Sequence, residues 1–211
     1  MLNVFWADAD RLALPSSAPI SAYRKQKISA IKHDRTRRCS FCAELLLIKA
    51  VRMAAPDFPL PLDFDVDEFG KPRLAGGEYE FSLSHPSHFA ACALSDAAVG
   101  LDIQVLVKCD ERLVRRFLTK GEQDHVLASK DRDAAFTRLW CRKESFLKAI
   151  GVGLRLPLDS FDASDENAAL IYDGTAFSFR EYRSDDLFFC VCAPSHRLPD
   201  QLCPLQIELP L

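Results

Sequence analysis

The sequence predicts an α+β fold made of two similar α/β lobes, residues 1–97 and residues 98–211. Three observations lead to this prediction. Each half contains one long stretch with apolar residues at three- and four-residue spacing, which is typical of an amphipathic helix. Each half also contains short alternating or apolar stretches, which indicate strands. No low-complexity linker lies between the halves, so we expect the two lobes to pack closely.

In the first half, Val4–Ala7 is short and apolar and is predicted to be a strand. Lys25–Met53 carries apolar residues at helical spacing, so it is predicted to be one long helix. The prolines that follow it predict a loop. Three further strands are predicted, at Asp63–Val66, Tyr79–Leu83 and Phe89–Leu94.

In the second half, Ala98–Gln104 is a predicted strand and Leu113–Phe117 a short helix. Thr119, with a glutamate three residues later, is a capping box that begins the next helix. Asp133–Ile150 is predicted to be a long helix that ends at Gly151, since glycine favours a helix C-terminus. The remainder is predicted to be an antiparallel meander with strands at Ala169–Tyr172, Ala176–Arg183 and Leu187–Ala193.

The composition is that of a globular protein. The 211 residues are 48% hydrophobic and 27% charged, with both signs mixed, which argues against a disordered chain. No apolar run reaches the roughly 18 residues that a transmembrane helix needs, and we recognise no secretion signal at the N-terminus. Several of the eight cysteines lie inside apolar runs. We therefore expect buried thiols, a cytoplasmic location and no membrane partner.

Charge is unevenly distributed, although the net charge is only −3. Between Arg24 and Arg38 there are seven lysines and arginines and a single acid, Asp34. Such a basic cluster favours a local anionic ligand, for example a phosphate or an acidic protein helix. The alternative interpretation is a solvated helix face without a ligand.

The stretch Val99–Gln104 offers candidate metal ligands. Side chains alternate along a strand, so Gly100, Asp102 and Gln104 share one face. Carboxylate and amide oxygens are hard ligands, which suit Mg²⁺. The alternative is an ordinary polar face of an exposed strand.

The stretch Trp140–Gly153 offers a second set of candidates. Glu144 and Lys148 are four residues apart and therefore lie on one face of the predicted helix. One interpretation is a surface ion pair. The other is a carboxylate for metal binding and proton transfer, beside a lysine that contacts phosphate.

Three shorter motifs are weaker signals. Phe81-Ser-Leu-Ser-His85 ends in a serine and a histidine, but it lacks the glycines of a hydrolase nucleophile turn. Its histidine is either a phosphate contact or a plain turn residue. Phe69-Gly-Lys-Pro72 places Lys71 beside a glycine that allows close approach of a ligand. Cys39-Ser-Phe-Cys42 lies inside an amphipathic helix and is assigned to packing.

The order and spacing of these motifs resemble the 4′-phosphopantetheinyl transferases of the Sfp and AcpT kind, over about Asp34–Leu158. The string Trp140–Gly153 is the most specific part of the resemblance. That family moves the phosphopantetheine arm of coenzyme A onto a serine of an apo acyl or peptidyl carrier protein and releases 3′,5′-ADP. The resemblance implies two lobes related by pseudo-twofold symmetry, with the active site in the cleft between them.

The resemblance also implies roles for individual residues. Asp102 and Glu144 are expected to hold Mg²⁺, and Lys148 to lie near the pyrophosphate and stabilise the departing 3′,5′-ADP. Glu144 is further expected to take the proton of the carrier serine, directly or through water. The expected coenzyme A contacts also include Arg35 first and Arg38 second for the 3′-phosphate, and Lys71, Ser84 and His85.

The sequence departs from the family pattern at Gln104, where many members have a second acid. We therefore expect a two-carboxylate metal site, to which Gln104 adds an amide oxygen through water. The carrier protein, of fatty acid, polyketide or peptide synthesis, is not specified by the sequence. The resemblance, with both lobes in one chain, implies a monomer.

Two other functions are compatible with parts of the sequence. The first is a non-catalytic module that binds coenzyme A or a carrier protein, which the missing acid at Gln104 would suit. The second is a phosphate- or nucleic-acid-binding protein that uses the basic cluster. The net charge of −3 disfavours nucleic acid as a partner.

Overall fold

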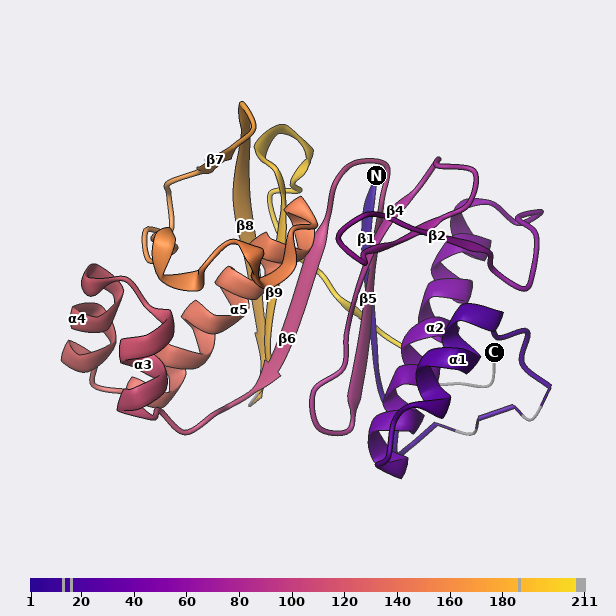
Figure 1. Ribbon diagram of the computed structural model, residues 1–211, viewed down its shortest axis with the longest axis horizontal. Helices are drawn as coiled ribbons and strands as arrows, with labels where there is room; N and C mark the ends of the chain where they lie inside the picture. Colours follow the sequence, from indigo (N-terminus) through magenta and orange to yellow (C-terminus); the bar gives the residue numbers. More distant parts are fainter. Residues whose placement is uncertain (13, 16, 186, 208–211) are drawn as a thin grey trace. The chain divides into compact units, whose positions relative to one another are not determined.

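The computed structural model describes residues 1–12, 14–15, 17–185 and 187–207. The chain divides into two compact units, Met1–Ala98 together with the segment from Cys203 onward, and Val99–Leu202. Each unit combines helices with a four-stranded sheet, so the fold is α+β (Figure 1).

The first unit contains a sheet with the order β10-β1-β5-β4. Its strands are β1 (Leu2–Asp8), β4 (Glu80–Ser84), β5 (Phe89–Ser95) and β10 (Leu205–Gln206). The long helix α2 (Asp34–Ala54) packs against β5 and β1 because the apolar residues of its inner face, including Cys39 and Cys42, are fully buried. A separate hairpin joins β2 (Phe64–Val66) to β3 (Pro72–Leu74).

The predicted helix over Lys25–Met53 is in fact two helices. The first, α1 (Ala22–Ser29), is capped by Ser21, and α2 begins at Asp34. The turn between them brings Arg24 back onto the buried Glu44, whose carboxylate also accepts hydrogen bonds from the amide and hydroxyl of Ser21. This long-range contact breaks the helix where the sequence has neither glycine nor proline.

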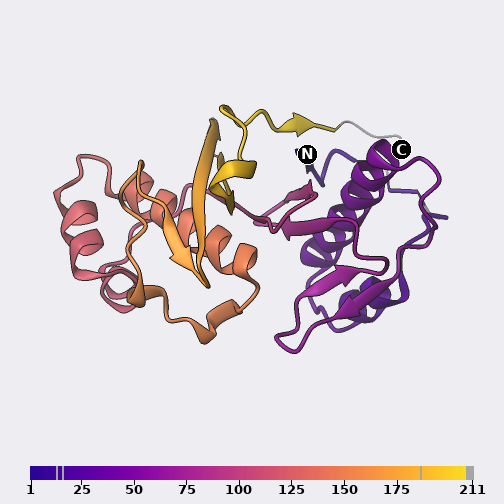
Figure 2. The same cartoon turned by 90° about the horizontal axis from the view of Figure 1, so that it is seen from above.

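The C-terminal segment also differs from the prediction. We assigned residues 98–211 to one lobe, but β10 pairs in parallel with β1 of the first unit. In Figure 2, β10 is the yellow arrow beside the grey terminal trace. Leu205 lies opposite Phe5, and Ile207 N donates to the carbonyl of Trp6, so backbone hydrogen bonding holds this segment in the first unit.

The second unit contains the antiparallel sheet β6-β9-β8-β7, covered by the helix α5 (Arg132–Ile150). The strands are β6 (Gly100–Val105), β7 (Leu170–Tyr172), β8 (Thr175–Ser184) and β9 (Leu187–Pro194). Two short helices, α3 (Glu111–Phe117) and α4 (Lys120–Ala128), precede α5, and three 3-10 turns follow it at Gly153–Arg155, Leu158–Ser160 and Ser195–Arg197.

Two local predictions in this unit are confirmed. Thr119 and Glu122 form a complete capping box at the start of α4. Helix α5 ends at Gly151, which adopts the left-handed conformation with φ 78°. Both features depend on residues close in sequence, which is why they can be recognised without tertiary information.

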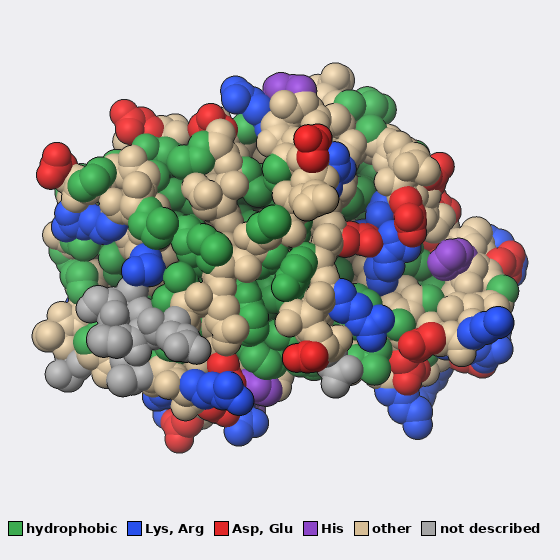
Figure 3. Space-filling model, turned by 180° about the vertical axis from the view of Figure 1, so that it is seen from behind, with side chains coloured by type: hydrophobic (Ala, Val, Ile, Leu, Met, Phe, Trp, Pro, Cys, Tyr) green, Lys and Arg blue, Asp and Glu red, His purple; other side chains and the backbone are tan. Residues whose placement is uncertain are grey.

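The surface agrees with the mixed composition. On the face drawn in Figure 3, acidic and basic side chains lie beside one another between areas of hydrophobic side chains. No helix within the described ranges combines the length and the apolar character that crossing a bilayer requires.

Gly100 sets how closely β6 approaches α5. A Cβ atom at this position would lie 1.9 Å from the carbonyl oxygen of Ser145 and 2.4 Å from the amide nitrogen of Ala149. Both are backbone atoms of α5, so no side-chain rotation could relieve the overlap. The absence of a side chain at Gly100 therefore allows strand and helix to lie in direct contact.

We predict that Gly100→Ala lowers the free energy of unfolding by about 1–3 kcal/mol, because the added methyl overpacks the interface between β6 and α5. Urea unfolding followed by circular dichroism measures this change. The matched control is Gly121→Ala in α4, where the new Cβ would meet side-chain atoms only, the nearest being the carboxylate of Asp162 at 3.1 Å. Equal stability of the Gly100→Ala and Gly121→Ala variants would contradict the proposed contact.

Candidate active site

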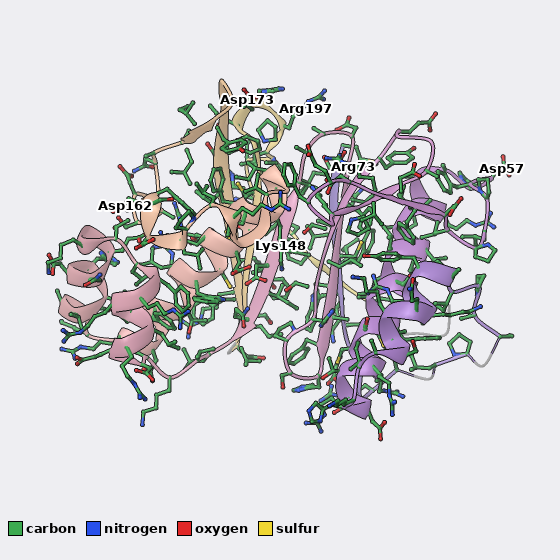
Figure 4. All side chains as sticks on the ribbon, viewed as in Figure 1. Asp57, Arg73, Lys148, Asp162, Asp173 and Arg197 are labelled. Atoms are coloured by element: carbon green, nitrogen blue, oxygen red, sulfur yellow. The ribbon has the colours of Figure 1, made fainter. Side chains whose placement is uncertain are left out.

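The second unit brings three of the predicted site residues together between β6 and α5. Asp102 lies in the middle of β6 and is buried, although we considered an exposed strand face as the alternative. Lys148, labelled in Figure 4, extends from α5, and its Nζ donates to Asp102 Oδ1 at 2.6 Å and to the carbonyl of Leu101 at 3.0 Å. Glu144 lies one helical turn before Lys148 and is half-buried.

Gln104 acts on the carboxylate of Asp102. Its Nε2 donates to Asp102 Oδ2 at 3.0 Å, so a protein donor contacts each carboxylate oxygen of Asp102. The amide of Gln104 therefore orients Asp102 from the same strand face that the alternation predicted.

The electrostatics of Glu144 indicate unbalanced negative charge. Burial raises the pKa of its carboxyl, the negative charge of Asp102 raises that pKa further, and the ammonium of Lys148 opposes both effects. Two carboxylates therefore influence each other across a space that contains one ammonium group. Such a donor set, with hard oxygens and an excess of negative charge, fits a divalent cation such as Mg²⁺.

The described residues offer no larger metal centre. Within those ranges no group of three or more histidine, cysteine, aspartate or glutamate side chains is arranged to hold an ion. Mg²⁺ commonly binds proteins through only one or two carboxylates, completed by water and substrate phosphates. Asp102 and Glu144 are therefore sufficient donors for that ion.

Lys143, which precedes Glu144, points away from this space and has a structural role. Its Nζ forms an ion pair with Glu122 at 2.8 Å, and both side chains are fully buried. The same ammonium donates to the carbonyl oxygens of Leu158 and Phe161. Glu122 in turn accepts hydrogen bonds from the amides of Thr119 and Ala163. This network fixes α5 to α4 and to the following turns.

Cys141 is a residue of this region that was not predicted as part of the site. This residue precedes Glu144 by three positions and therefore lies on the same side of α5. Burial raises the pKa of its thiol, and so does the nearby charge of Asp102. The helical spacing from Glu144 and Lys148 was the available signal that Cys141 lines the site.

The remaining predicted residues lie in the first unit. Arg38 near the start of α2 donates from Nε to the carbonyl of Ala9 at 2.6 Å and from Nη2 to the carbonyl of Leu12. Arg35 is largely exposed, and its ion-pair partner among the described residues is Asp10, at 3.5 Å. Arg35 is therefore more available to a ligand than Arg38.

The same end of α2 approaches the loop that follows β4. The thiol of Cys39 donates to the carbonyl of Ser87 at 3.5 Å. Ser84 is the buried last residue of β4, and His85 follows it and is exposed. The predicted arginines and the serine–histidine pair thus lie in connected parts of one unit.

Lys71 lies near the other end of β4. Its Nζ is 3.6 Å from a carboxylate oxygen of Glu80, the first residue of that strand. Burial lowers the pKa of Lys71, while Glu80 opposes this change. In Figure 4 the neighbouring Arg73 is labelled, and it also pairs with Glu80. The contacts of Lys71 therefore do not join it to Ser84 and His85.

Comparison with known proteins identifies the family. Residues 98–192, which include the whole cluster around Asp102, match the model of the 4′-phosphopantetheinyl transferase superfamily. A 4′-phosphopantetheinyl transferase from Bacillus subtilis is 30% identical over 185 residues, which is 83% of each chain. The chain belongs to the 4′-phosphopantetheinyl transferase superfamily. The predicted family is confirmed, and the protein is an enzyme of the transferase class.

Other relatives of this transferase are matched over less of their length. The 4′-phosphopantetheinyl transferase Sfp of Bacillus subtilis (strain 168) is 30% identical over 67% of this chain and 65% of its own. An L-aminoadipate-semialdehyde dehydrogenase-phosphopantetheinyl transferase from Xenopus laevis is 30% identical over 74% of this chain and 58% of its own.

Among solved structures, the holo-[acyl-carrier-protein] synthase of Thermotoga maritima aligns with a TM-score of 0.33 and 19% identity. The alignment covers 46% of this chain and 62% of that one. The expected pseudo-twofold relation between two lobes stays a prediction.

We predict that Lys143→Met lowers the free energy of unfolding of this transferase by about 3–5 kcal/mol, because it leaves Glu122 buried without its counter-ion. Urea denaturation gives the value. Lys120→Met is the control, since Lys120 forms an exposed pair with Asp124 and is expected to cost less than about 1 kcal/mol. Equal unfolding midpoints for the two variants would exclude a structural role for Lys143.

We predict that Glu144→Gln makes the metal-free protein more stable at neutral pH. A carboxyl whose pKa is raised by folding is deprotonated at a cost to the folded state, and glutamine removes that cost. The gain should shrink as the pH falls through the raised pKa, where Glu144 becomes protonated in the folded state, and should vanish below the ordinary glutamate pKa, where both states are protonated. Thermal unfolding of both proteins from about pH 4 to about pH 8, a range that spans carboxyl titration, shows whether the variant is more or less stable than wild type. Lower stability of the Glu144→Gln variant at neutral pH would contradict it.

Proposed function

We propose that this transferase moves the 4′-phosphopantetheine arm of coenzyme A onto a serine of an apo carrier protein, with Mg²⁺ bound at Asp102 and Glu144 and release of 3′,5′-ADP. The observation that carries the proposal is the cluster of two carboxylates and one ammonium between β6 and α5. The names of the relatives, all phosphopantetheinyl transferases, support the group that is moved.

The chain's own groups suit phosphoryl transfer. The reaction places negative charge on the leaving 3′,5′-ADP, and fixed positive groups stabilise such charge. When bound, Mg²⁺ would supply charge neutralisation at the pyrophosphate. The ammonium of Lys148 is within the same cluster and would donate to a phosphate oxygen.

Glu144 is the candidate general base. Burial and the charge of Asp102 raise its pKa, which makes the carboxylate a better proton acceptor than that of an exposed glutamate. Glu144 would take the proton of the carrier serine, directly or through water, as the serine oxygen bonds to the phosphorus next to pantetheine and the bond to 3′,5′-ADP breaks.

The first unit supplies candidate contacts for the rest of coenzyme A. Arg35 is the proposed ligand of the 3′-phosphate, since the guanidinium of Arg38 already donates to two carbonyl oxygens. Lys71, Ser84 and His85 are the further proposed contacts.

The carrier protein would dock in part on the basic segment before and at the start of α2. Arg24 is excluded from this surface because it is buried against Glu44, which corrects the extent of the patch expected from sequence. The exposed basic residues of the segment are Lys25, Lys27, Lys32 and Arg35.

The direct test is incubation with coenzyme A, Mg²⁺ and a panel of apo carrier proteins, followed by mass spectrometry of the carriers. We expect at least one carrier to gain a phosphopantetheine group, and Glu144→Gln to slow the transfer by roughly 10²–10⁴-fold. Lys120→Met, on the surface of α4, serves as the control with normal transfer.

Two outcomes would contradict these assignments. Carriers of unchanged mass across the panel would argue against transferase activity toward carrier proteins. Transfer at the wild-type rate by the Glu144→Gln variant would remove Glu144 from the roles of base and metal ligand. The panel also identifies which class of carrier is the substrate.

A further inference from the structure

The carboxylate of Asp102 already has a cation as its partner in this structure. The ammonium of Lys148 is 2.6 Å from Oδ1, and the side chain of Asp102 is only 4% exposed. A buried carboxylate is strongly destabilising unless a positive group compensates its charge. Lys148 supplies that compensation.

A further contact of Asp102, with Gln104, lies on its other carboxylate oxygen. Gln104 Nε2 donates to Oδ2 at 3.0 Å from the same strand, through a side chain shorter than that of lysine. Lys148 is different, because its ammonium is at the end of a flexible four-carbon chain. Its side chain is 30% exposed, so the ammonium has room to leave Oδ1.

A divalent cation and the ammonium of Lys148 would need the same oxygen. Both are compact positive charges that carboxylate oxygens coordinate or hydrogen-bond at short range. Two such charges on one oxygen repel each other. The repulsion between two positive charges about 4 Å apart remains substantial at the effective dielectric constant near a protein surface. Occupation of Asp102 Oδ1 by one therefore disfavours the other.

We propose that Lys148 is a built-in counter-ion that competes with the metal for Asp102. In the metal-free enzyme its ammonium neutralises Asp102, and it leaves Oδ1 when a divalent cation binds. The released ammonium is then available to a phosphate group of the substrate. This inference rests on the proposed function, because it takes Asp102 to be a metal ligand.

The competing explanation is that Lys148 only holds Asp102 in the correct orientation. The two explanations predict opposite signs. If Lys148 competes, its removal tightens metal binding in the absence of coenzyme A. If Lys148 only orients Asp102, its removal weakens metal binding.

The test is isothermal titration of the full-length, metal-free chain with Mg²⁺ alone, comparing wild type with Lys148→Met. We expect the variant to bind Mg²⁺ about tenfold more tightly, which corresponds to about 1.4 kcal/mol. Lys120→Met removes the same net charge from exposed α4 and should bind as wild type does. Lys148→Arg, which keeps a cation on Asp102, should also bind as wild type does.

The double variant Asp102→Asn with Lys148→Met should lose the gain, because the contested oxygen is no longer charged. Lys148→Met binding that is equal to wild type or weaker overturns the competition. If that variant does not fold, the wild-type chain gives an independent measurement. Acetylation of Lys148 by a lysine-reactive anhydride, read by mass spectrometry, should increase when Mg²⁺ is added, and unchanged labelling overturns the proposal.

The failure of this inference can be distinguished from failure of the proposed function. A wild-type chain that transfers phosphopantetheine, with no gain in Mg²⁺ affinity on removal of Lys148, overturns the competition alone. A wild-type chain and variants that all fail to bind Mg²⁺ overturn both the competition and the proposed metal site.

Discussion

The close contact of β6 with α5 at Gly100 is the constraint on which the candidate site depends. With no side chain at this position, the strand lies against the backbone of Ser145 and Ala149. Asp102 is two residues further along the same strand face, and Glu144 and Lys148 each directly precede one of the two contacted residues of α5. A wider separation of strand and helix would take the ammonium of Lys148 out of reach of Asp102. One glycine thus sets the distance over which the two carboxylates and the lysine interact.

Helix α5 uses neighbouring residues for opposite purposes. Lys143 is directed into the helical side of the unit, where Glu122 and two carbonyl oxygens satisfy its charge and its donors. Glu144, the next residue, is directed toward β6, where charge is compensated only in part. Because successive helical residues point about 100° apart, one rigid helix can hold a structural ion pair and present a reactive carboxylate. The motif Lys-Glu-Ser therefore combines stability and chemistry in adjacent positions.

The sequence predicted features that depend on neighbouring residues and missed those that depend on distant ones. The capping box at Thr119 and the end of α5 at Gly151 follow from local backbone chemistry, and both are present. The turn after α1 was missed because it depends on Glu44, twenty residues from Arg24. The strand β10 was missed because its partner, β1, is at the other end of the chain.

In the candidate site, too, the local features were predictable from the sequence and the long-range contact was not. Strand and helix periodicity placed Asp102 and Gln104 on one face and Glu144 with Lys148 on another. The two interpretations of the helix pair were a surface ion pair of Glu144 with Lys148 and a lysine that contacts phosphate, and neither included a contact with β6. The structure has Lys148 on Asp102, an arrangement that requires the contact at Gly100 and therefore knowledge of tertiary packing.

The incomplete charge balance around Glu144 is itself an argument for function. Elsewhere in the described part of this unit, the buried charges of Glu122 and Lys143 neutralise each other and have hydrogen-bond partners on both sides. Folding alone would favour the same solution at Asp102 and Glu144, since a carboxyl with a raised pKa reduces stability at neutral pH. Two carboxylates beside a single lysine are instead one positive charge short. A ligand that brings positive charge would remove this deficit, and a cation bound together with a phosphate-containing substrate is such a ligand. The incomplete charge balance thus lies where the proposed metal and substrate would bind.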